Sequence, residues 1–153
     1  MDNDLDQWFA EYRRLNAALG LYYDRISAIM DSKRRWKRPP TEPEEVIDGL
    51  IYFYEAGLVN EGDVFGYMHC MIEQRKALEA IGAKGCLAAL EALMPYYEEQ
   101  QQLATDDKKR EYWHRTRCDR QQAELLAEDV NEFARLMLAY AQQHDSEIGS
   151  VTA

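Results

Sequence analysis

Glu111 and His114 form an E-x-x-H pattern, the spacing that one element of a carboxylate-bridged di-iron site requires. Residues three apart on a helix lie on the same side and can bind one metal ion. Such sites need a second E-x-x-H and two further glutamates, and the chain has no second copy. Cys118 lies four residues after His114 and could share a metal with it, but a zinc site needs three or four ligands. A helical enzyme, metal-dependent or small-molecule-binding and centred on Glu111, His114 and Cys118, is therefore kept as an alternative.

Other catalytic patterns are missing from the sequence. It contains no glycine-rich phosphate loop, no G-x-S-x-G and no H-E-x-x-H. His69 and Glu73 are also four apart, but they too supply only two ligands. We therefore predict a non-catalytic protein without a metal or cofactor.

The run from Lys33 to Arg38 is the only stretch typical of nucleic-acid binding. Its five cations flank Trp36, which could stack on a base. Outside the run, 13 basic residues face 28 acidic ones, a net charge of −15 that repels nucleic acid. We expect the run to connect two helices, and keep nucleic-acid binding through it as a second alternative.

Acidic residues dominate the next part of the chain, and the whole chain has a net charge of −10. No Lys or Arg occurs from Pro39 to Gln74. A concentrated negative surface disfavours direct contact with nucleic acid or anionic membrane and favours a cationic protein partner. We predict that the partner-binding residues are the eight carboxylates of this region: Glu42, Glu44, Glu45, Asp48, Glu55, Glu61, Asp63 and Glu73.

Apolar residues at spacings of three and four predict helices throughout the chain, and no period of two indicates a strand. Thr41 and Glu44 predict a capping box, Gly82 a helix end, and Pro95 a kink or an early break. The fold class is all-α: a single domain over residues 1–144, built as a bundle of five or six helices, with a disordered tail over 145–153. The expected helical segments are 4–30, 44–55, 63–81, 83–103 and 107–144, the last with a bend within 115–122.

Three cysteines, Cys70, Cys86 and Cys118, are an odd number without C-x-x-C spacing, which is typical of reduced thiols. The first residues lack the pattern of a signal peptide, and no apolar run approaches the length that spans a bilayer. We therefore expect a cytoplasmic protein.

Two stretches resemble a family of small acidic all-helical bacterial proteins, the DNA-mimic proteins. Val59 to Tyr67 resembles an Asn- and Gly-rich element of this family, although Asp63 and Gly66 depart from its pattern. Ala77 to Lys84 is similar to the family's helix end at Ile-Gly-Ala. With the flanking helices, the resemblance covers about residues 44–140.

The resemblance implies a non-catalytic, often dimeric protein whose acidic surface occupies the basic face of a DNA-binding protein. Similar acidic proteins act as immunity proteins that neutralise toxins. Our leading hypothesis is therefore an inhibitor or regulator that binds a positively charged protein, either a DNA-binding regulator or a toxin.

Overall fold

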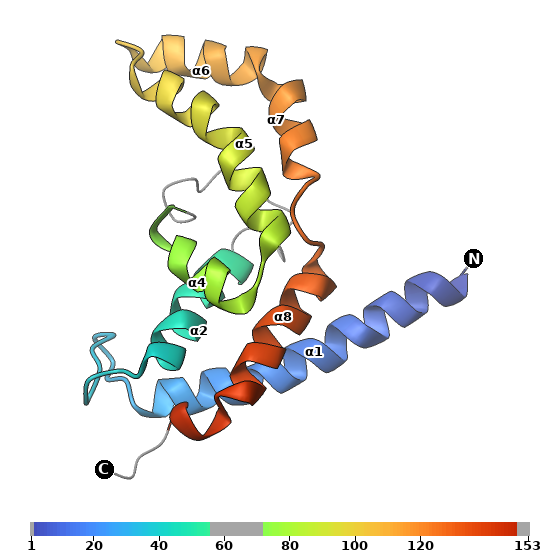
Figure 1. Ribbon diagram of the computed structural model, residues 1–153, viewed down its shortest axis with the longest axis vertical. Helices are drawn as coiled ribbons and strands as arrows, with labels where there is room; N and C mark the ends of the chain where they lie inside the picture. Colours follow the sequence, from blue (N-terminus) through green and yellow to red (C-terminus); the bar gives the residue numbers. More distant parts are fainter. Residues whose placement is uncertain (1, 56–71, 150–153) are drawn as a thin grey trace.

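The computed structural model describes residues 2–55 and 72–149 (Figure 1). Every regular element in these two ranges is helical, which confirms the all-α class. They contain seven α-helices and one 3₁₀ helix, so a bundle of five or six helices is not confirmed. The elements are α1 (Asp2–Ala28), α2 (Glu42–Phe53), α4 (Arg75–Ile81), α5 (Lys84–Gln101), α6 (Asp106–Arg115), α7 (Arg117–Glu124), α8 (Val130–Gln143) and the 3₁₀ helix Asp145–Glu147.

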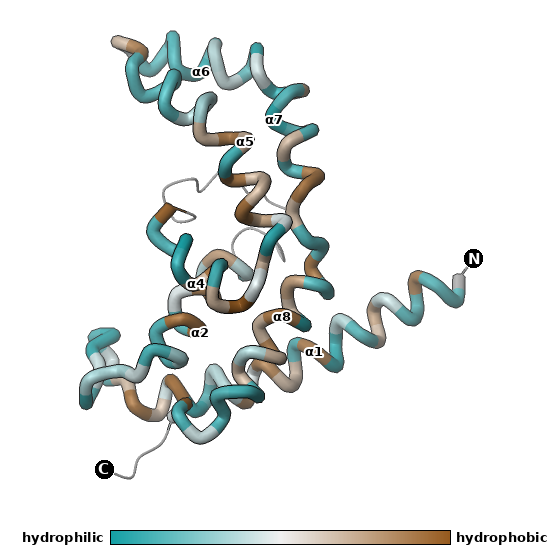
Figure 2. The backbone as a smooth tube through the Cα atoms, in the orientation of Figure 1, coloured by the Kyte–Doolittle hydropathy of each residue, from teal (hydrophilic) through white to brown (hydrophobic). Residues whose placement is uncertain are grey.

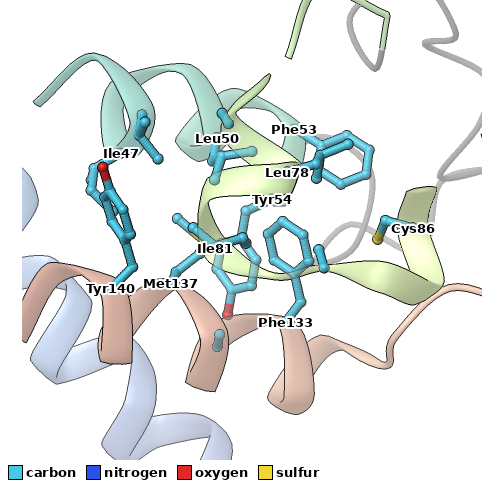
Figure 3. Close-up of a cluster of buried hydrophobic side chains, with 14 of the residues drawn as sticks. Ile47, Leu50, Phe53, Tyr54, Leu78, Ile81, Cys86, Phe133, Met137 and Tyr140 are labelled. Carbon is cyan, nitrogen blue, oxygen red and sulfur yellow. The ribbon is translucent and has the colours of Figure 1, made fainter. Parts of the chain in front are cut away.

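One hydrophobic core joins α1, α2, α4, α8 and the first half of α5, and Ala123 of α7 also belongs to it. Its centre is Phe133 on α8, whose ring stacks on Tyr54 and meets the edge of Phe53 (Figure 3). The second half of α5 leads away from this core to α6 and α7 (Figure 1). Figure 2 shows that α6 and α7 are mostly hydrophilic, in contrast to the apolar residues gathered around the core.

Two local signals in the sequence are confirmed. Thr41 accepts a hydrogen bond from the backbone N–H of Glu44, and the Glu44 side chain accepts one from the N–H of Thr41, which completes the capping box of α2. Gly82 ends α4 with a φ of 76°, a left-handed conformation that glycine adopts without steric cost.

After residue 83, the expected segment 83–103 agrees with α5, whereas the expected segment 107–144 differs from the structure. Of the kink and the early break that Pro95 left open, the early break does not occur, because α5 continues past Pro95 to Gln101. The expected stretch 107–144 is divided into three helices. The chain turns at Thr116, within the interval where a bend was expected, and again over 125–129, where Asp129 caps α8.

The prediction of disorder after residue 144 is wrong for the described part of the tail. Ile148 is fully buried in the core. Arg25 donates to the carboxylate of Asp145 and to the carbonyl of Ile148. The backbone N–H of Gly149 donates to Glu44. One buried apolar side chain and the hydrogen bonds to Arg25 and Glu44 hold this part of the tail against α1 and α2.

The first turns of α1 differ from the buried stripe that the sequence predicts. Leu5 is 60% exposed and Phe9 is 44% exposed. Asn131, at the start of α8, donates a hydrogen bond to the carbonyl of Trp8. The N-terminal end of α1 therefore extends beyond α8, the helix that lies alongside the rest of α1 (Figure 1). No helix among the described residues has the length and apolar character needed to cross a membrane.

Candidate binding surfaces

The eight carboxylates of the predicted partner-binding set fall into several environments. Glu42, Glu45, Glu55 and Glu73 are exposed, and Asp48 is half-buried. Glu61 and Asp63 lie outside the described residues. Only part of the predicted set is therefore available to a partner on the described surface.

Glu44 does not belong to an exposed acidic surface. Its side chain has no exposed area and forms an ion pair with Arg38 from the basic run. Burial alone would raise the pKa of Glu44, but hydrogen bonds from Arg38, Thr41 and Gly149 lower it to about 2. Glu44 is a structural carboxylate that joins the helix start, the connector and the C-terminal tail.

A stripe of acidic and aromatic side chains runs along the outer side of α2. Glu45, Asp48 and Tyr52 are spaced by three and four residues, so they lie on one side of α2, and the exposed Glu55 follows two residues after its end. Tyr52 is 64% exposed, so its ring is accessible to a partner. We call these four residues the α2 stripe.

The α2 stripe borders a groove of about 590 Å³ between the end of α1, the connector and α2. Arg34 of the connector lies in this groove, with its guanidinium carbon 5.7 Å from the centre of the Tyr52 ring. Burial raises the pKa of Asp48, and the nearby charge of Arg34 opposes this rise. The stripe thus already binds one guanidinium, through a cation–π contact and a neighbouring carboxylate.

Two further features belong to this groove. Arg34 has a φ of 59°, a left-handed conformation that costs an L-residue about 1 kcal/mol or more. The hydroxyl of Tyr23 is buried and has no hydrogen-bond partner in the described part of the structure. Strained backbone and unsatisfied polar groups are concentrated at functional sites.

The basic connector is folded against its own protein. Arg38 binds Glu44, Arg35 lies 3.5 Å from Asp31, and Lys37 donates to the carbonyl of Ala28. Trp36 is half-buried against the core. These contacts engage Arg35, Trp36, Lys37 and Arg38, so part of the basic run has a structural role as a connector.

A second hollow, of about 960 Å³, lies where α5, α6 and α7 meet. His114 lines it, but Glu111 and Cys118 are not among its lining residues. Glu111, His114 and Cys118 are all exposed. Among the residues that the structure describes, no group of three or more His, Cys, Asp or Glu side chains could hold a metal ion. The geometry therefore does not favour the metal-dependent alternative.

The same hollow contains cations that the sequence interpretation missed. The available signal was a second basic cluster, because six of the 18 Lys and Arg residues lie within positions 108–120. Acidic residues interrupt this cluster in the sequence, and only the turn at Thr116 brings the two helices together. The cations that line the hollow are Lys109, Arg110, Arg117 and Arg120.

Comparison of the chain with models of known protein families, with curated proteins and with solved structures finds no match.

Proposed function

We propose that this protein is a non-catalytic, acidic binding protein that inhibits or regulates a cationic protein partner through the α2 stripe. The observation that carries the proposal is the position of Arg34 over Tyr52, beside Asp48. A surface that holds the chain's own guanidinium has the groups needed to hold an arginine or lysine of a partner.

The charge of the chain supports the same proposal. A net charge of −10 attracts a cationic protein over a distance of about 8 to 10 Å at ordinary salt and accelerates its association. Tyr52 and the half-buried Trp36 both line the groove, and Tyr and Trp are residue types enriched among those that dominate binding energy at interfaces. The charge provides long-range attraction, and the groove provides the close contact.

The resemblance over residues 44–140 favours a DNA-binding protein as the partner, with a toxin as the other candidate. Both present a basic face that an acidic protein can occupy. The resemblance also implies a homodimer, which sedimentation equilibrium can test.

Affinity capture from the native host, with mass spectrometry, tests the proposal. The bait is compared with a stripe variant, Glu45→Gln/Asp48→Asn/Glu55→Gln, and with a control variant of equal charge, Glu98→Gln/Glu111→Gln/Asp119→Asn. The control residues are exposed and lie on α5, α6 and α7. We expect a basic protein that the native and control baits retain at low salt, and that the stripe variant loses. Equal capture by all three baits, or capture unaffected by high salt, contradicts the proposal.

A further inference from the structure

The hollow of about 960 Å³ where α5, α6 and α7 meet has walls formed by the sides of α6 and α7 that face each other. The lining residues of α6 and those of α7 recur at spacings of three and four, so each helix contributes one continuous side. Two amides, from Gln100 and Gln121, complete the polar lining. Four cations, Lys109, Arg110, Arg117 and Arg120, line the hollow together with two carboxylates, Asp106 and Glu124, in a chain whose net charge is −10. Arg110 also forms an ion pair with Asp107, at 2.8 Å.

Arg120 is held in a fixed position in this hollow. It is only 4% exposed, and its guanidinium carbon lies 3.5 Å from the centre of a Trp113 ring. It donates to the carbonyl of Trp113 at 2.6 Å and to the hydroxyl of Thr116 at 3.3 Å. A cation that is ordered before a ligand arrives loses little conformational entropy on binding, so it is suited to recognise an anion.

We propose that this hollow binds a small molecule that carries a chain of two or more phosphate groups. Guanidinium groups match phosphate oxygens through paired hydrogen bonds, and a lysine adds a compact positive charge. The hollow is near the upper end of the roughly 300 to 1,000 Å³ typical of small-molecule sites, much larger than one phosphate. A chain of phosphates can reach cations on both helices. This proposal does not depend on the proposed function of the α2 stripe.

Titration with sodium tripolyphosphate tests the proposal. In the full chain with Trp8→Phe and Trp36→Phe, Trp113 is the only tryptophan and reports on the hollow directly. At constant ionic strength, we expect a saturable change in Trp113 emission and a 1:1 stoichiometry by calorimetry. Arg117→Gln and Lys109→Gln should each weaken binding about tenfold, because each removes a charge-assisted hydrogen bond.

Arg115→Gln is the matched control, since Arg115 is an exposed cation of α6 that does not line the hollow. Thermal melting confirms that each variant is folded. A parallel titration with ATP shows whether the ligand is a nucleotide or an inorganic phosphate chain. If ATP binds and tripolyphosphate does not, the ligand is a nucleotide. If both bind equally, the phosphate chain is sufficient for binding. The proposal is overturned if neither ligand gives a saturable signal, or if Arg115→Gln weakens binding as much as Arg117→Gln does.

Discussion

Arg38 donates two hydrogen bonds to the fully buried carboxylate of Glu44, at 2.8 and 2.7 Å. The same carboxylate accepts from the N–H groups of Thr41 and Gly149. One side chain therefore connects the basic connector, the start of α2 and the C-terminal tail. This contact withdraws Glu44 from the exposed acidic surface and Arg38 from the exposed basic run.

Substitution of Glu44 by glutamine should destabilise the fold. The NH₂ group of the introduced amide would face the N–H donors that now bind the carboxylate. At least one of those donors would therefore lose its acceptor. We expect a loss of about 2 kcal/mol, or roughly 4 to 8 °C in Tm. Thermal melting at pH 7 measures it. Glu45→Gln, an adjacent exposed carboxylate, is the control, and equal melting of the two variants would show that the buried contact contributes nothing.

The contribution of Glu44 should depend on pH in a defined window. Its folded-state pKa is about 2, below the usual value of 4.5, so the unfolded state binds the proton more readily. The stabilisation is therefore complete above about pH 5 and is lost as the pH falls toward 2. The Tm difference between the native protein and Glu44→Gln should shrink over this range. A difference that is constant from about pH 6 to about pH 2.5 would contradict the assignment.

The C-terminal tail should contribute measurably to stability. Ile148→Ala removes a fully buried side chain and should cost about 3 kcal/mol. Ser146→Ala, at an exposed position of the same segment, should change little. Chemical denaturation of the two variants provides the comparison. If Ile148→Ala unfolds at the same denaturant concentration as Ser146→Ala, the tail does not pack as described.

Glu128 should protect Cys86 from thiol reagents. The N-cap residue of α5, Ala83, has no capping side chain, and Glu128 instead accepts from the N–H groups of Gly85 and Cys86. Burial, together with the adjacent Glu128 carboxylate, raises the pKa of the Cys86 thiol. Two variants each retain one of these two cysteines: Cys70→Ser/Cys118→Ser retains Cys86, and Cys70→Ser/Cys86→Ser retains the exposed Cys118. We expect the labelling of Cys86 in the first to be about a hundredfold slower than the labelling of Cys118 in the second.

Adding Glu128→Ala to the background that retains Cys86 should accelerate its labelling, because the start of α5 then opens more easily. Glu132→Ala, at an exposed position of α8, is the control for removal of a nearby acidic side chain. Equal labelling rates in the two variants would exclude a protective role for Glu128.

The features that the sequence predicts correctly are local ones. The Thr41 capping box and the end of α4 at Gly82 depend on a few neighbouring residues, so their signals are complete in the sequence. Pro95 leaves a kink and an early break open in the sequence, and α5 continues through it to Gln101.

The errors concern residues whose partners are distant in the chain. Nothing near Ile148 indicates that it enters the core, since its place there depends on contacts with α1. In the sequence, Glu44 fits two roles, a capping residue and an exposed surface carboxylate. Its hydrogen bonds with Arg38 and Gly149, which the sequence does not reveal, show that it is not an exposed surface carboxylate. The cations of α6 and α7 likewise converge only through the turn between those helices.

Chemical-shift mapping tests the central claim, binding of a cationic partner at the α2 stripe, most directly. Isotope-labelled protein is titrated with a short arginine-rich peptide, and backbone amide shifts are followed residue by residue. We predict perturbations concentrated at Glu45, Asp48, Tyr52 and Arg34, and their loss in the stripe variant but not in its control. Perturbations spread evenly over the exposed carboxylates of α1, α5 and α6 would contradict the claim.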